Sequence, residues 1–389
     1  MAKKWSSRLT FFAFVVLMVG LGSNDSLRGI FSTIFQEHFS LTTTQLGLIV
    51  TASYIGNLVF LLVGGNLSTR FSKKRVLQVL ILIWMAALAL FAFTSNYTVL
   101  LIGMALALGS STLLNTTMNL ITPLLFATAP GFFVNFLFFT QEIGTSGSQY
   151  ILGSHADGFS FWQHTNLVLL ILGAVAFVLL LFCNVPEEAA APADAPAQKG
   201  GYDWRIIVPY VLVFGFYFIA EHGVMNWMVA YGVDGLGLPQ ASAAKYLSVF
   251  FGGMMIGRLC LSPLVDKLGA LKSLAAFGGV SCVLYLIGSL GGAVTMPVWA
   301  ISGLSFSILY PTLVMSIRLF FPHGQVAGAA GTIISVASLF DILFNVGFGR
   351  LVDTLGYGVS IYVLPLAMAA FIITFLAFSR GHGKEQQKN

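Results

Sequence analysis

Four acidic side chains stand inside long apolar stretches of the sequence and are the groups best placed to do chemistry. They are Asp25, Glu142, Glu221 and Asp341. An ionisable group in hydrocarbon is costly, so each one kept in a membrane span is a candidate functional residue. Burial favours the uncharged form of a carboxyl group, which lets the group take up and release a proton. We therefore expect the carrier of a proton among these four, with Glu221 and Glu142 ranked above Asp25.

A basic residue, Arg28, accompanies these acids. It follows Asp25 by three residues, so the two side chains share one helix face. In one interpretation they neutralise each other as a local ion pair. In the other, Asp25 takes up a proton and Arg28 is left to hold a polar or anionic molecule. Asp341 is a further partner to consider for Arg28 or for Arg258, and the sequence alone does not choose.

Uncharged polar residues recur at helical spacing in the same stretches. One stripe, at steps of four, four and three residues, consists of Ser111, Asn115, Asn119 and Thr122. A polar face within a membrane must meet protein or water. It either forms hydrogen bonds between helices or lines a cavity that offers amide and hydroxyl groups to a hydroxyl-rich molecule.

Further polar and aromatic residues extend this candidate binding surface. Tyr217 shares a helix face with Glu221, and His222 and Asn226 lie beside that face. Aromatic side chains present apolar rings on which a sugar can stack, although most of them in this chain must serve packing. A second stripe consists of Asn135, Phe138, Glu142, Thr145 and Gln149. The full set of binding candidates is Asn24, Arg28, Asn57, Asn115, Asn119, Gln149, Tyr217, Asn226, Trp227, Tyr310 and Asn345.

The composition places these residues in a membrane protein. Hydrophobic residues make up 57% of the 389 residues and charged residues 8%, against roughly a quarter charged in soluble domains. Mean hydropathy is +0.88. The net charge of +5 comes from basic residues in short loops beside apolar runs, which is typical of membrane topology and speaks against nucleic-acid binding. Cys183, Cys260 and Cys282 show no paired spacing, so we expect packing roles rather than disulfides or a metal site.

Twelve apolar runs, each near the ~20 residues that cross a bilayer, predict twelve transmembrane helices. Six precede the segment from Pro186 to Asp203, whose Pro, Ala and Gly content is typical of a linker. The first run begins after MAKKWSSR and continues to about Phe35 without a small-residue cleavage site, which favours a retained span over a signal peptide. The other runs cover residues 44–66, 76–94, 98–124, 131–154, 163–184, 204–231, 242–265, 271–291, 296–319, 326–350 and 358–379.

The predicted fold is an all-α membrane protein with two pseudo-symmetric six-helix bundles, residues 1–185 and 204–389, joined by the linker 186–203. With alternating spans, most Lys and Arg residues near the span ends fall on one side, and only Lys245 and Arg350 fall on the other. The excess of basic loop residues stays cytoplasmic. Both termini and the linker are therefore expected in the cytoplasm, with the protein in the cell (inner) membrane.

Two loops in corresponding places of the halves are similar to each other. GGNLSTRFSKKR (Gly64 to Arg75) and GRLCLSPLVDKLGALK (Gly257 to Lys272) resemble the signature loop of the major facilitator superfamily, Gly-x-Leu-x-Asp-Arg-x-Gly-Arg-Arg. The first copy has Thr69 at the usual Asp and Ser72 at the usual Gly, while the second keeps Gly269. The resemblance implies that loop charges stabilise one gating state. The corresponding residues are Arg70, Lys74, Arg75, Asp266 and Lys267.

Other segments resemble the fucose permease-like sugar:proton symporters of that superfamily. They are SILYPT (Ser307 to Thr312), AKYLSVFFGGMMIGRL (Ala244 to Leu259) and YFIAEHGVMNWMVAY (Tyr217 to Tyr231), with a looser match over Asn119 to Gly144. The resemblance implies a facilitator fold with a midplane cavity and alternating access. It also ties proton coupling to an Asp of the first helix and a Glu of the fourth. Here those positions fall near Gly29 and at Asn115, which cannot titrate.

The expected function is proton-coupled symport of a small polar solute, most plausibly a sugar or sugar derivative. The alternatives are an exporter or antiporter of a specific metabolite and an organic-anion carrier that uses Arg28. Drug antiporters of the superfamily usually carry an Arg in the fourth span and a Gly-Pro motif in the fifth. Here residues 100–109 of the fourth span lack Arg and residues 142–154 of the fifth lack Pro, so the resemblance disfavours multidrug export. The sequence has no HExxH, GxSxG or P-loop pattern, so an enzyme is not expected. The expected partners are the solute, protons and the lipid bilayer. No cofactor and no metal are expected, and the protein is expected to be a monomer.

Overall fold

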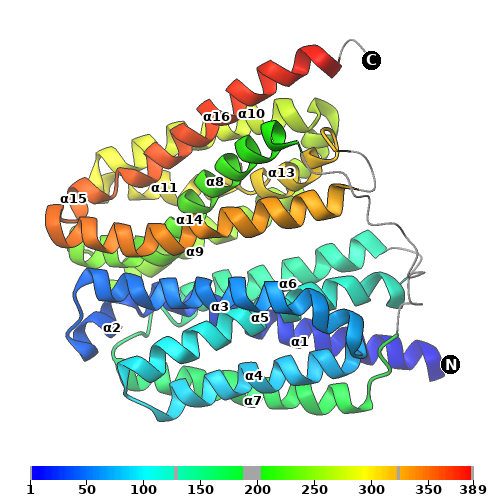
Figure 1. The fold of residues 1–389 in the computed structure, drawn as a ribbon. Helices are drawn as coiled ribbons and strands as arrows, with labels where there is room; N and C mark the ends of the chain where they lie inside the picture. The colour runs from blue at the N-terminus through cyan, green and yellow to red at the C-terminus, as the bar shows by residue number, and fades with distance from the viewer. Residues whose placement is uncertain (1, 127–129, 187–202, 322–324, 387–389) are drawn as a thin grey trace. The chain divides into compact units, whose positions relative to one another are not determined.

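The structure of the 389-residue chain is a computed structural model that describes residues 2–126, 130–186, 203–321 and 325–386. The chain forms two compact units, Met1–Ala195 and Pro196–Asn389. Helices are the regular secondary structure throughout the described residues, and no strand occurs among them. Figure 1 shows the chain as packed helices. The prediction of an all-α protein is confirmed.

The first unit contains seven helices in its described residues, of which six correspond to predicted spans. The short α2 follows α1 after a break at Phe31, so the first predicted span ends before the expected Phe35. The helices are α1 (Ala2–Ile30), α2 (Ser32–Phe39), α3 (Thr43–Arg70), α4 (Lys73–Phe93), α5 (Tyr97–Leu125), α6 (Pro130–Ile151) and α7 (Phe159–Phe182).

The second unit begins with α8 (Trp204–Ala230), which runs into a π-helical turn, η1 (Tyr231–Gly235). The predicted span 296–319 is broken into three helices by turns at Ser302 and at residues 307–308. The second turn has a local cause, because Pro311 has no N–H to donate to the carbonyl of Ser307. The remaining elements are α9 (Gln240–Leu268), α10 (Ala270–Leu290), η2 (Gly292–Val294), α11 (Met296–Ile301), α12 (Gly303–Phe306), α13 (Leu309–Ile317), α14 (Val326–Leu355), α15 (Tyr357–Ser360) and α16 (Val363–Gln386).

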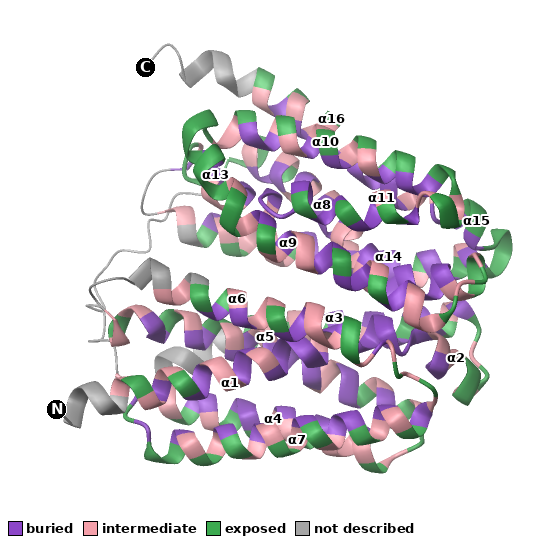
Figure 2. Ribbon diagram, turned by 180° about the vertical axis from the view of Figure 1, so that it is seen from behind, coloured by how far each residue is buried: buried purple, intermediate pink, exposed green. Residues whose placement is uncertain are grey.

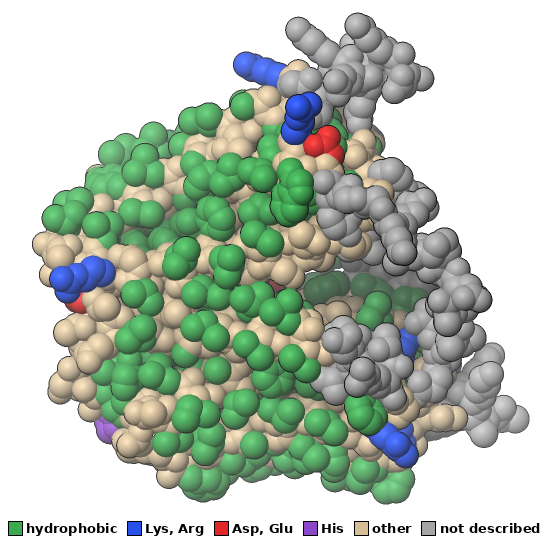
Figure 3. Space-filling view, viewed as in Figure 1, with side chains coloured by type: hydrophobic (Ala, Val, Ile, Leu, Met, Phe, Trp, Pro, Cys, Tyr) green, Lys and Arg blue, Asp and Glu red, His purple; other side chains and the backbone are tan. Residues whose placement is uncertain are grey.

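Eleven stretches of the described residues are long and apolar enough to cross a membrane. The remaining predicted span is α6, which has 22 residues and packs along α1. Figure 3 shows a face covered by hydrophobic side chains, with the visible charged groups near the ends of the helices. Large apolar residues such as Phe182 and Leu343 are exposed. A surface of this kind suits contact with lipid rather than water, so the chain is a multi-pass membrane protein.

Glycines allow corresponding helices of the two units to pack closely. A Cβ on Gly56 of α3 would overlap the carbonyl oxygen of Ala105 in α5, and a Cβ on Gly303 of α12 would overlap that of Phe250 in α9. These contacts join spans 2 and 4 of one unit and spans 8 and 10 of the other. Small residues at helix interfaces let backbones approach within a membrane. Figure 2 shows buried residues along the faces where helices of a unit meet.

The two signature-like turns are built differently. Gly269, between α9 and α10, has a φ of +81°, a conformation that favours glycine. Ser72, at the same place between α3 and α4, has a φ of −59°, and its side chain accepts a hydrogen bond from the backbone N of Arg75 at 3.4 Å. The first turn therefore needs no glycine, since Ser72 caps the following helix. The departure from the signature at this position thus has a local structural reason.

Candidate functional site

The polar residues of α1 contact three different helices. Asp25 Oδ2 accepts a hydrogen bond from Ser111 Oγ of α5 at 3.2 Å. The guanidinium carbon of Arg28 lies 5.8 Å from the ring centroid of Tyr54 in α3, and Arg28 is buried. The buried Asn24 accepts from Trp84 Nε1 of α4 at 3.2 Å. Asp25 and Arg28 thus each contact a further helix, and Asn24 joins α1 to α4.

A chain of amides connects α5 to α6. Asn119 Nδ2 donates to Asn115 Oδ1 at 2.6 Å, and Asn115 Nδ2 donates to Gln141 Oε1 at 2.6 Å. Thr122, the last member of the predicted stripe, donates instead to the carbonyl of Met118 in its own helix. The stripe therefore supplies contacts between helices, as one of its two interpretations proposed. Gln141 was not among the predicted site residues. It could have been included, because it is a polar residue one helical turn before Thr145.

Several buried polar atoms of the first unit form no hydrogen bond with the described residues. Gln149 of α6 is fully buried, and neither of its amide atoms has a partner. The same holds for Arg28 Nε, Asn57 Oδ1 and Asn119 Oδ1. Buried polar groups are nearly always hydrogen-bonded in folded proteins. These atoms therefore retain capacity to bind a polar solute or water. Glu142 is half-buried on the same helix as Gln149, and the Asn135 side chain lies outside the described residues.

Three ionisable side chains meet in the second unit. His222 Nδ1 of α8 lies 2.9 Å from Asp341 Oδ1 of α14, and His222 Nε2 lies 3.9 Å from Glu221 Oε2. Asp341 is 2% exposed, whereas Glu221 and His222 are half-buried. Asp341 thus pairs with His222 rather than with Arg258 of the same unit. The sequence alone did not predict a function for His222, although its position next to Glu221 within an apolar stretch could have indicated one.

Aromatic residues lie beside these groups. The ring of Phe218 stacks on His222 with centroids 5.3 Å apart. The fully buried Tyr217 stacks on Phe306, and its ring centroid lies 5.8 Å from that of Tyr310. The Phe218 ring centroid also lies 6.3 Å from that of Tyr310. Residues from α8, α13 and α14 therefore adjoin one another around His222 within this unit.

Trp227 and Asn345 hold α8 and α14 together. Trp227 Nε1 donates to Asn345 Oδ1 at 2.8 Å, and Asn345 Nδ2 donates to the carbonyl of Asp341 at 2.8 Å. Both side chains are fully buried, and Asn226 is buried as well. The hydrogen-bonding groups of this pair are therefore already engaged within the unit. That gives the two residues a structural role next to Asp341.

The predicted gating residues have different surroundings. Lys74 Nζ donates to the carbonyls of Leu181 and Cys183 at 2.9 and 2.8 Å, so it caps the carboxyl end of α7. Arg75, Asp266 and Lys267 are exposed. The side chain of Arg70, the last residue of α3, lies outside the described residues.

The three cysteines differ in their exposure. Cys183 is buried, Cys282 is partly buried and Cys260 is exposed, so the expected packing role is wrong for Cys260. All three cysteines are free. Within the described residues, no three His, Cys, Asp or Glu side chains come together as a group that could hold a metal ion.

Comparison with known proteins agrees with this architecture. The family model of the Major Facilitator Superfamily matches residues 10–340. The L-fucose-proton symporter of Escherichia coli is 24% identical over 74% of this chain and 75% of its own length. The cis,cis-muconate transport protein of Acinetobacter baylyi is 23% identical over 80% of this chain and 76% of its own length. The crystal structure of a D-xylose-proton symporter superimposes with a TM-score of 0.77 at 16% identity, covering 95% of this chain and 96% of that one.

These relatives are transporters, which confirms the prediction that the chain is not an enzyme. The family model covers most of the chain, and the helical fold agrees with it. The chain belongs to the Major Facilitator Superfamily.

Proposed function

We propose that this protein is a proton-coupled symporter for a sugar or sugar derivative. It works as a monomer in the cell (inner) membrane, with both termini cytoplasmic. Its two six-helix bundles, residues 1–185 and 204–389, alternate access to the solute. The predicted linker 186–203 that joins them lies outside the described residues except at its two ends. The observation that carries the proposal is the position of His222, which is hydrogen-bonded to Asp341 and lies 3.9 Å from Glu221. The similarity to the L-fucose-proton symporter supports it.

The proton step uses His222. Imidazole is the side chain whose charge changes between pH 5 and 8. A neutral His222 leaves two carboxylates close together in a membrane-embedded unit, which is an unfavourable arrangement. Proton uptake at His222 places a cation between Glu221 and Asp341, at 3.9 and 2.9 Å, and compensates their charge. The protonated state therefore lowers the cost of burying this group when the bundle closes around its solute.

The solute step uses the first unit. Sugar hydroxyls donate and accept hydrogen bonds, as do the amides of Gln149, Asn57 and Asn119. The buried atoms of these side chains that have no hydrogen-bond partner among the described residues suit such a ligand. Arg28 adds a donor at Nε, and the Tyr54 ring beside it offers an apolar face. These residues are the proposed sugar contacts.

The test is uptake by the purified protein in proteoliposomes. Labelled fucose, xylose, glucose, galactose and small dicarboxylates are offered with and without an inward proton gradient. Sugar accumulation that requires the gradient supports the proposal. Sugar uptake at the same rate with and without the gradient contradicts the proposed proton coupling. Transport of a dicarboxylate without uptake of any sugar contradicts the proposed solute class.

A second candidate function is favoured by Arg28. A buried guanidinium is suited to a carboxylate, which it can bind with paired hydrogen bonds. The similarity to the cis,cis-muconate transport protein points to the same solute class. An organic-anion carrier should lose transport when Arg28 becomes Lys, because Lys lacks the planar fork of donors. A sugar carrier should tolerate that change better than Arg28→Gln.

A further inference from the structure

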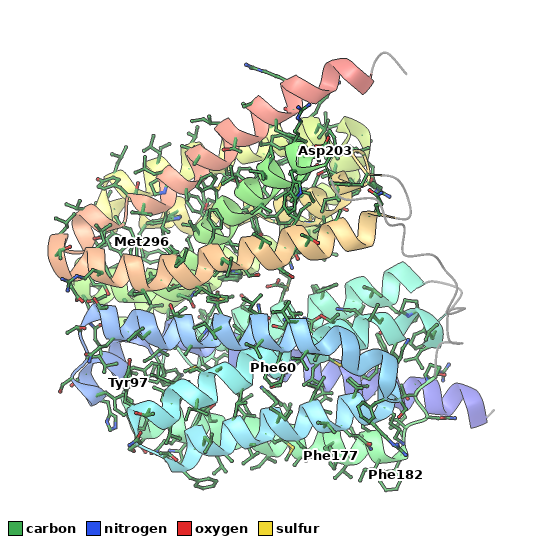
Figure 4. All side chains as sticks on the ribbon, viewed as in Figure 1. Phe60, Tyr97, Phe177, Phe182, Asp203 and Met296 are labelled. Carbon is green, nitrogen blue, oxygen red and sulfur yellow. The ribbon has the colours of Figure 1, made fainter. Side chains whose placement is uncertain are left out.

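Four helices of the first unit, α3, α4, α5 and α7, enclose an apolar groove with a volume of about 840 Å³. Val59 of α3, Val79 of α4 and Leu113 of α5 contribute to its lining. Figure 4 labels two further lining residues, Phe60 of α3 and Phe177 of α7. Val59 and Val79 are each about half exposed, at 49% and 55%. The groove is therefore open rather than part of the packed core.

One charged residue, Arg75, lies among the described residues that line this groove. Its side chain is exposed, and the other strongly polar lining residue is Gln78. The preceding Lys74 is already bound to the carbonyls that end α7. The groove thus combines a long apolar lining with a cation that remains accessible.

The cation stands at one end of the groove. Arg75 is the third residue of α4, and the lining extends along that helix to Ile83. With a rise of 1.5 Å per residue, Ile83 lies about 12 Å farther along the axis. One leaflet of the hydrocarbon core is about 15 Å deep. The groove therefore runs from headgroup depth into the acyl-chain region of one leaflet.

We propose that this groove is a binding site for an anionic glycerophospholipid, with an acyl chain along α4 and the phosphate at Arg75. A soluble anion would use the arginine but not the apolar lining. A zwitterionic lipid would fill the lining but gain less from the positive charge. Basic pockets between transmembrane helices at the cytoplasmic side recognise anionic headgroups in this way. The distribution of Lys and Arg places this end of α4 on that side.

The test is a lipid titration of the purified full-length protein, followed by native mass spectrometry. Phosphatidylglycerol and phosphatidylcholine with identical acyl chains are compared, and glycerol phosphate serves as the headgroup without chains. We expect phosphatidylglycerol to bind more tightly than phosphatidylcholine. Arg75→Gln should weaken phosphatidylglycerol binding about fivefold, the effect of one surface charge, and should remove the preference between the two lipids.

Two further variants keep the test decisive. Val79→Trp fills the groove and should weaken the binding of both lipids. This variant also tests the proposal if Arg75→Gln does not fold. Lys272→Gln is the matched control, because Lys272 is the exposed third residue of α10 in the second unit, as Arg75 is of α4. The proposal would be overturned by an equal loss with Lys272→Gln or by equal binding of both lipids to the wild type. Binding of glycerol phosphate as tightly as phosphatidylglycerol would also overturn it, because the apolar lining would then contribute nothing.

Discussion

His222 and Asp341 join α8 to α14 through a hydrogen bond of 2.9 Å, although 119 residues separate them in the chain. Both helices carry residues that the sequence marks as proton candidates, namely Glu221 on α8 and Asp341 on α14. A change of charge at the imidazole therefore acts directly on a contact between two membrane-spanning helices. Under the proposed function, proton binding at His222 is coupled to the packing of these two helices.

His222→Gln should abolish proton-driven accumulation of the solute while leaving solute exchange across the membrane in place. The amide keeps a polar group beside Asp341 but cannot take up a proton. Accumulation and counterflow in proteoliposomes are the two measurements. His164→Gln, an exposed histidine at the start of α7, is the control and should leave both unchanged. Proton-driven accumulation by His222→Gln at the wild-type level would exclude the proposed role.

Asn345→Ala should lower the stability of the folded protein by roughly 1 kcal/mol, because it removes the acceptor of the buried Trp227 indole. The melting temperature in detergent is the measurement. Thr332→Ala on the same helix is the control, since its exposed hydroxyl donates only to its own helix. If Asn345→Ala melts like the wild type but no longer binds solute, Asn345 is a ligand rather than a structural residue.

Gly303→Ala should destabilise the second unit by about 1–3 kcal/mol or prevent its folding, since the added methyl group would overlap the Phe250 carbonyl and push α12 from α9. Gly331→Ala on α14 meets no atom within 4 Å. It should be neutral or stabilising by up to about 1 kcal/mol. The yield of monodisperse protein and its melting temperature distinguish the two. Equal behaviour of the two variants would show that the α9–α12 contact relaxes readily.

Lys74→Gln should cost about 0.5–1 kcal/mol of stability, because it removes a cation from the carboxyl end of α7. Lys272→Gln in the second signature-like segment is the control, because Lys272 is exposed in the first turn of α10 and not at a helix carboxyl end. Thermal unfolding of both variants is the check. Should Lys74→Gln keep its stability yet change the transport rate, the gating role implied by the signature loop gains support over the capping role.

The sequence by itself determined the helical membrane fold, because the length of a membrane span is a local property. About 20 apolar residues cross a bilayer wherever they stand in the chain. The predicted ranges 76–94 and 98–124 match α4 and α5 within three residues at each end. The acids Glu221 and Asp341 were also evident, since a charge stands out in an apolar run. The break at residues 307–308 was foreseeable from Pro311, yet a single helix over 296–319 was predicted.

The partners of those residues were decided only by the tertiary structure. Helical periodicity places Ser111 and Asn115 on one face, but it does not show that Ser111 meets Asp25 or that Asn115 meets Gln141. Likewise, nothing in the local sequence brings Asp341 to His222. These contacts depend on which helices pack together and at what rotation, and close approaches such as that of Gly303 to Phe250 set both. A site assembled from several spans therefore emerges only when the bundle is folded.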